Sequence, residues 1–286
     1  MKQLLFGLVL IVTFIEFQST SLAQEAKALA AETEAAKKDG DKKSKERLDY
    51  MYNSAAGFVG KRSSDGAKVK IYNKPLLRFT NPLHGCREGL FVAWVDEQNR
   101  PVAAGQIFLM RGTENNWYIE TQSIADCPIN LESKSNGLWA PTKAGIKWTK
   151  FKDAPRPADK KQLRLAHMRR LADRFRVEDD LNGDEDVLRL MPSPMIRYED
   201  ADKGVIDGSL FAYVQGTDPE LLVQVEARED TDGERSYHWA LSAMTSAKVV
   251  AYLDEERVWS KEQSSGSQTE IFYMRQLSGG VPYPME

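Results

Sequence analysis

Short runs of aliphatic, β-branched and aromatic residues recur at close intervals through the second half of this 286-residue chain. Turn residues such as Asp232-Gly233 separate neighbouring runs. Parallel strands need a crossover of about a dozen residues or more, so connections this short predict antiparallel pairing. The runs lie at 187–191, 195–198, 209–215, 221–227, 237–244 and 249–253.

The first half carries a second group of strand patterns. Two apolar runs at 90–95 and 102–110 flank a polar turn and predict a hairpin. Further strands are expected at 69–72, 76–80 and 117–124, whereas residues 126–157 are rich in proline and glycine and read mostly as loop.

One helix is predicted over residues 158–177. Its apolar side chains recur at helical spacing and form a single stripe. That stripe consists of Leu165, Met168, Leu171, Ala172 and Phe175. The expected fold is therefore α+β and β-weighted, a twisted antiparallel sheet of several short strands with one long amphipathic helix packed on it.

The N-terminus has the layout of a secretory signal peptide. Lys2 precedes an apolar run over residues 4–15, and Ser21-Leu22-Ala23 places small residues before a cut at Ala23/Gln24. The run is shorter than the ~20 residues of a membrane-spanning helix, although an uncleaved anchor is the alternative. We therefore expect an exported chain, periplasmic or extracellular, with no transmembrane segment after cleavage.

The predicted signal peptide divides the chain into three segments. Residues 1–23 are the signal peptide, and residues 24–47 form a charged low-complexity spacer of mainly Ala, Lys and Glu. A helix in this spacer is expected to break at Asp39-Gly40-Asp41. Residues 48–286 are expected to fold as a single α+β domain.

Charge is divided unevenly along the chain. Residues 24–177 are basic and residues 178–286 are acidic, so the charges either pair within one domain or form a basic face for an anionic partner. An exported protein rarely meets nucleic acid, so that partner would be an anionic envelope polymer or lipid headgroup. The candidate contacts on the predicted helix are Arg164, Arg169, Arg170 and Arg174.

Cys86 and Cys127 are the two cysteines of the chain. In an exported protein they can form a disulfide, and two buried thiols or a metal or catalytic role are the alternatives.

Catalytic and cofactor motifs are absent from the sequence. It contains no Gly-x-Ser-x-Gly, Walker, dinucleotide-binding or His-Glu-x-x-His pattern. His84-Gly85-Cys86 resembles half of a zinc site, but no second ligand pair follows it. The acidic run at 180–186 departs from the EF-hand spacing and reads as a solvated turn. No metal or cofactor is therefore expected.

Several phrases occur together that resemble a family of uncharacterised exported bacterial proteins, over roughly residues 75–259. The resemblance implies export and a single domain, and it carries no catalytic residues because no activity is established for the family. The phrases are Pro75-Leu76-Leu77-Arg78-Phe79-Thr80-Asn81-Pro82, Leu188-Arg189-Leu190-Met191-Pro192-Ser193-Pro194, the run from Ser209 to Glu220, and Tyr237-His238-Trp239-Ala240-Leu241.

Two functions remain open at the level of sequence. The first is a non-enzymatic binding domain of the envelope or the secreted fraction, whose partner is an envelope protein or a polysaccharide. The second is an exported hydrolase that uses acidic residues of the C-terminal half. The weak candidates for its catalytic groups are Asp207, Asp218, Glu226 and His238.

Overall fold

The computed structural model describes residues 34, 37–112, 116–181, 183–277 and 280–281. The predicted signal peptide and its cleavage site lie outside these residues. The chain divides into two units, residues 1–48 and residues 49–286, which are described separately below.

In the first unit, residues 37–48 are helical and mostly exposed. The helix continues through Gly40, so the predicted break at Asp39-Gly40-Asp41 is wrong. Lys43 Nζ lies 2.7 Å from Asp39 Oδ2, one turn earlier, and such a pair supports an exposed helix.

The second unit begins with helical residues 49–56 and contains a second helix, α2 (Lys161–Ala172), with a short 3-10 turn at Ala201–Lys203. Across the described part of the chain, none of the helices has the length and apolar character that a membrane span requires.

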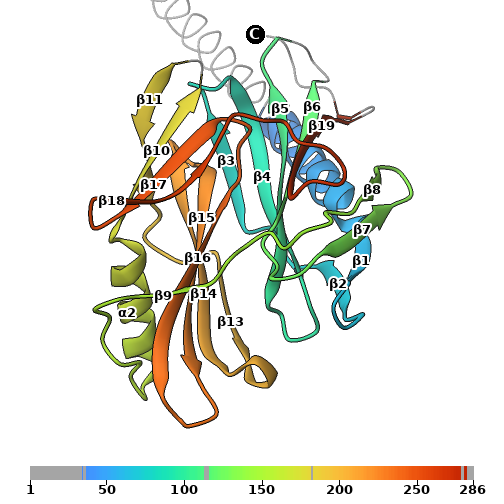
Figure 1. Cartoon of the computed structure of the whole chain (residues 1–286). Coiled ribbons are helices and arrows are strands. Elements are labelled where there is room, and N and C mark those ends of the chain that lie inside the picture. Colours follow the sequence, from blue (N-terminus) through green and yellow to red (C-terminus); the bar gives the residue numbers. More distant parts are fainter. Residues whose placement is uncertain (1–33, 35–36, 113–115, 182, 278–279, 282–286) are drawn as a thin grey trace, which may run out of the picture. The chain divides into compact units, whose positions relative to one another are not determined.

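The strands of the second unit form three antiparallel sheets (Figure 1). The nine-stranded sheet consists, in spatial order, of β19 (Phe272–Gln276), β6 (Trp117–Ser123), β5 (Pro101–Met110), β4 (Cys86–Val95), β2 (Lys68–Ile71), β1 (Val59–Arg62), β7 (Ile129–Ser133) and β8 (Gly137–Trp139), while β3 (Leu77–Asn81) also pairs with β4.

The six-stranded sheet consists of β12 (Arg189–Leu190), β14 (Val205–Gln215), β15 (Asp218–Glu229), β16 (Arg235–Ala243) and β9 (Thr149–Lys150), while β13 (Ile196–Asp200) also pairs with β14. The four-stranded sheet consists of β11 (Asp184–Val187), β10 (Phe175–Leu181), β17 (Lys248–Leu253) and β18 (Glu256–Lys261).

The six-stranded sheet is the middle layer of this unit. Along β14, Leu210 and Ala212 belong to a core shared with β3, β4 and β5 of the nine-stranded sheet. Phe211 and Tyr213 belong to a second core, which α2 and strands β10 and β17 close. Successive side chains of a strand point to opposite faces, so a strand buried on both faces needs a nearly continuous apolar run. The apolar run at 209–215 has that composition.

Two sequence-based expectations about this architecture require correction. The predicted single sheet is three sheets, and the predicted helix at 158–177 ends at Ala172. Phe175 continues the apolar spacing of the helix, but it is the first residue of β10 and pairs with Leu253 of β17. The helical spacing of apolar residues thus extends into β10, where the inward side chains alternate as in a strand.

The antiparallel character and the predicted hairpin are confirmed. β4 and β5 pair directly, with Ala93 opposite Ala104, and β14, β15 and β16 form a meander. The structure also contains strands that the sequence did not predict, including β7 in the segment expected to be mostly loop and β11 in the acidic run expected to be a turn; the others are β1, β10, β18 and β19.

Ion pairs join the basic and the acidic parts of the chain. Arg164 of α2 pairs with Asp207 of β14, and Arg100 pairs with Glu226 of β15. Both pairs are buried, so they satisfy charges inside the unit rather than on a basic outer face. The arrangement agrees with the prediction that the two charge types pair within one domain.

Candidate metal centre

The four predicted catalytic residues do not form one site. Asp218 is at the start of β15 and Glu226 is eight residues later in the same strand, which corresponds to about 27 Å at the usual rise per residue. His238 is opposite Glu226 on β16, and Asp207 lies on β14. Their positions do not support a hydrolase built on this set.

Asp207 is the centre of a buried ion-pair group. Its carboxylate accepts hydrogen bonds from Arg164 Nε at 2.9 Å and from Arg197 Nε at 2.8 Å. The Asp207 side chain is fully buried, so these two arginines supply the charge that its burial requires. Asp207 is therefore a structural residue.

Glu226 has a similar environment. Its Oε1 accepts hydrogen bonds from Arg100 Nε at 3.1 Å and from the Tyr198 hydroxyl at 2.8 Å, and its Oε2 accepts one from Arg228 Nε at 2.7 Å. His238 lies beside this group, and burial, with the charge of Arg228, lowers its pKa. These contacts leave Glu226 without an oxygen directed at a ligand.

Cys86 and Cys127 are both buried free thiols, so the predicted disulfide is not formed. Cys86 is the first residue of β4, whereas Cys127 lies near Ser64, with 3.4 Å between Sγ and Oγ. Burial raises the pKa of the Cys86 thiol. This structure therefore corresponds to the alternative of two buried thiols.

The four predicted anion-binding arginines also separate. Arg164 is committed to Asp207, and Arg174 Nε donates to Asp254 Oδ1 at 3.0 Å. Arg169 and Arg170 are exposed and line a shallow groove between α2 and residues 192–194. Only this pair remains as a candidate contact for an anionic partner.

A cavity of about 340 Å³ lies where the nine-stranded and six-stranded sheets meet. Its walls come from β5, β6 and β19 on one side, and from the start of β15 and the turn after β16 on the other. Carboxyl groups are concentrated on these walls, together with one imidazole. The titratable lining residues of this kind are His84, Glu120, Asp218 and Glu220.

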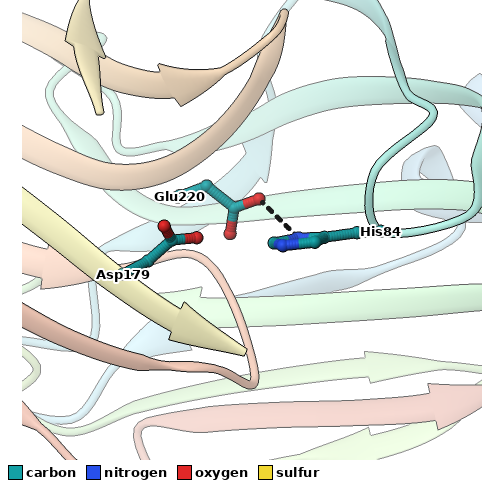
Figure 2. A group of neighbouring side chains, drawn as sticks. All are labelled: His84, Asp179 and Glu220. Carbon is teal, nitrogen blue, oxygen red and sulfur yellow. Dashed lines mark ion pairs between the residues drawn. The ribbon is translucent and has the colours of Figure 1, made fainter. Parts of the chain in front are cut away.

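At one end of this cavity, His84, Asp179 and Glu220 converge from three separate parts of the chain (Figure 2). Each offers one ligand atom, and these atoms lie within 4.8 Å of one another. His84 lies in the turn between β3 and β4, Asp179 on β10 and Glu220 on β15. His84 Nδ1 is 3.4 Å from Glu220 Oε1. Three sheet-anchored segments therefore present an imidazole and two carboxylates to one point.

Asp179 is the least satisfied member of this group. The residue is 2% exposed, and neither carboxyl oxygen has a hydrogen-bond partner in another described residue. Burial, with the neighbouring Glu220 carboxylate, raises the pKa of Asp179 to about 7. A buried carboxyl without a partner is costly, and such groups are retained where they bind something.

Burial also acts on His84, and it lowers the imidazole pKa. The hydrogen bond and the charge of Glu220, with the charge of Asp179, outweigh that effect and raise the pKa overall. The carboxylates of Glu220 and Asp179 thus favour a positive charge beside them, and a protonated His84 supplies part of it. A metal cation would supply it more completely and would release that proton.

Asn81 holds two of the acidic side chains in place. Its side-chain nitrogen is 3.2 Å from Asp218 Oδ2 and 3.3 Å from Glu220 Oε1, and its side-chain oxygen accepts the backbone N–H of His84 at 3.2 Å. Asn81 is fully buried. One amide therefore fixes the position of the His84 turn relative to β15, as a supporting residue around a metal site would do.

One imidazole nitrogen and two carboxylate oxygens limit which metal ions can bind here. Imidazole nitrogen suits Zn²⁺, Fe²⁺ and Ni²⁺, and carboxylate oxygen extends the range to Mn²⁺. Zinc holds nitrogen and oxygen ligands at about 2.1 Å, which places tetrahedral ligand atoms about 3.4 Å apart. The ligand atoms lie within 4.8 Å of one another, so the most distant pair would have to approach by about 1.4 Å to reach that spacing. Three protein ligands leave at least one coordination position open, as in catalytic rather than structural zinc sites.

The sequence predicts no metal here: His84 is noted only as half of a zinc site, and neither Asp179 nor Glu220 is named. Asp179 directly follows the predicted helix, at the start of the acidic run, and Glu220 is the last residue of a phrase that carries the family resemblance. The local signal was the alternation of Phe175, Val177 and Asp179, which all point inward from β10. That alternation would have placed Asp179 in the interior.

Comparisons with protein-family models, with curated proteins and with solved structures found no match for this chain.

Proposed function

We propose that this chain is an exported binding protein that holds a divalent transition-metal ion, Zn²⁺ in the first instance, at His84, Asp179 and Glu220. The single observation that carries the proposal is the buried Asp179 carboxyl, which has no hydrogen-bond partner in another described residue and lies beside an imidazole and a second carboxylate. The N-terminal leader is what supports export.

Charge balance favours a divalent ion over a monovalent one. Two ionised carboxylates carry two negative charges, and a neutral His84 adds a nitrogen ligand without adding charge. The ion would thus replace the protonated imidazole as the counter-charge of Asp179 and Glu220. Among the described residues, no lysine or arginine is within ion-pair distance of either carboxylate, so the imidazole of His84 is the basic group that the ion would displace as counter-charge.

The test is calorimetric titration of the metal-free protein with Zn²⁺, Mn²⁺ and Co²⁺. We expect one site for Zn²⁺ with a dissociation constant of about 1 µM or tighter, and a Co²⁺ absorption spectrum of low coordination number. Asp179→Asn and His84→Ala should each weaken binding at least about tenfold, which corresponds to about 1.4 kcal/mol.

Asp180→Asn is the matched control, because Asp180 is the next residue of β10 and points to the opposite face. It should bind Zn²⁺ as the unmodified protein does. Two results would overturn the proposal: no binding of any of the three ions below about 1 mM, or equal affinity in the Asp179→Asn variant.

A further inference from the structure

Glu120 is a second buried carboxyl that the proposed metal site does not use. It lies on β6, is 5% exposed and lines the 340 Å³ cavity, into which its carboxyl faces. Burial and the charge of Glu220 raise the pKa of this carboxyl, the charge of Lys261 opposes them, and no hydrogen bond is among the influences on it. A buried carboxyl that faces a cavity in this way is free to bind a ligand there.

The positive charge of Lys261 lowers the pKa of Glu120, but the hydrogen bonds of its ammonium group go to other residues. Its Nζ donates to three backbone oxygens, those of Ala247 at 3.2 Å, Glu262 at 3.3 Å and Ser264 at 3.4 Å. These three acceptors use all the donors of an ammonium group. Lys261 therefore holds the segment after β18 and does not neutralise Glu120 by direct contact.

The other walls of the cavity are mainly apolar and aromatic. Phe108 and Tyr118 stack with their ring centroids 5.8 Å apart, and Met244 and Met274 also line the space. Arg111 is the one arginine of the lining, and it is exposed. The cavity is at the lower end of the size range for small-molecule sites and combines apolar walls with a few polar groups, as such sites do.

The electrostatics of the cavity select the charge of its ligand. Glu120, Asp218 and Glu220 all contribute carboxyl groups, and Asp218 Oδ1 is buried without a hydrogen-bond partner in the described structure. A carboxylate ligand would be repelled by these groups, whereas a cation would relieve their mutual repulsion. Aromatic and thioether side chains also accommodate an organic cation, because ring faces attract positive charge.

We propose that this cavity binds a small organic ammonium ion, with the ammonium group at Glu120 and the apolar part against Phe108, Tyr118 and Met274. The site adjoins the metal ligands and shares Glu220 with them, but Glu120 comes from β6 and neither His84 nor Asp179 is needed to hold it. The ligand is thus a primary amine with a compact apolar or aromatic body.

The test uses three probes that share a phenylethyl group and differ in the charge of the group attached to it: 2-phenylethylamine, 2-phenylethanol and 3-phenylpropanoate. Titration calorimetry should show the amine binding with a dissociation constant below about 1 mM, and the neutral and anionic probes binding at least about tenfold more weakly. Glu120→Gln should lose at least about tenfold in amine affinity. Glu132→Gln, on an exposed position of β7, should lose nothing.

Zn²⁺ titration of the Glu120→Gln variant reports whether the variant is folded and separates the two proposals. Unchanged Zn²⁺ binding with lost amine binding supports the ammonium site. Amine binding that survives in His84→Ala supports its independence from the metal. The proposal is overturned if the alcohol binds as tightly as the amine, if Glu120→Gln binds the amine normally, or if no probe binds.

Discussion

Asp179→Asn should make the metal-free protein more stable at pH 8, even though it removes a proposed ligand. The native carboxyl is 2% exposed and has no hydrogen-bond partner in another described residue. Ionising it in the folded protein therefore costs free energy that an uncharged amide of the same shape does not cost.

The magnitude follows from the pKa. Burial and Glu220 raise the pKa of Asp179 from its ordinary 3.8 to about 7. Complete ionisation against that shift costs about 4 kcal/mol. Screening by solvent in the adjoining cavity, and the unpaired amide that Asn introduces, reduce the net gain to about 1–2 kcal/mol. For a unit of this size, that gain corresponds to a rise of about 2–8 °C in Tm.

The sign of the pH dependence is fixed by the same shift. The folded protein holds the Asp179 proton up to about pH 7, whereas the unfolded chain releases it near pH 3.8. The free energy of unfolding of the native protein therefore falls as the pH rises through this window and is level above it. The advantage of Asp179→Asn should be near zero at pH 4 and complete by pH 8.

The assay is urea unfolding in a chelating buffer from pH 4 to pH 8, repeated at pH 8 with Zn²⁺. At a hundredfold excess over the native dissociation constant, Zn²⁺ adds about 2.7 kcal/mol to the native protein and, for a tenfold weaker site, about 1.4 kcal/mol to the variant, so the advantage of the variant should shrink by at least about 1.3 kcal/mol. An Asn variant that is less stable than the native protein in chelator would show that Asp179 has a stabilising partner. An advantage of the variant that stays the same when Zn²⁺ is added would refute the metal assignment.

Two further outcomes are expected. Asp207→Ala leaves the buried Arg164 and the half-buried Arg197 without their carboxylate and should cost about 3–5 kcal/mol in urea unfolding. Ala at the exposed Asp202 should change stability by less than about 0.5 kcal/mol. Cys86 and Cys127 should both be alkylated only after unfolding, and a non-reducing peptide map that shows them bridged would contradict the free-thiol arrangement.

The strands could be predicted from the sequence because their signals are local. Apolar alternation and turn residues such as Gly216 and Asp232-Gly233 mark the β14–β16 meander within a few residues of its observed bounds. The strands that the sequence did not predict carry weaker patterns. In β10, Phe175 fits both the helical spacing of α2 and the alternation of a strand, and pairing with β17 decides between them.

The candidate metal site could not be predicted in the same way, because its geometry depends on pairing between distant segments. His84 is found next to Glu220 only because the turn between β3 and β4 lies against the start of β15, where Asn81 bonds to Asp218 and Glu220. Asp179 reaches them through the register of β10 with β17. No spacing along the chain encodes these contacts.

The middle sheet has a consequence for how the molecule opens. Because β14 and β15 contribute side chains to both apolar cores, neither core can come apart while the other remains closed. Their amides should be among the slowest to exchange with solvent, as in the most protected cooperative unit of a domain. Glu220 lies on one of these strands, whereas His84 lies on a turn. Of the two residues, we therefore expect His84 to be the one whose backbone moves when a ligand enters or leaves.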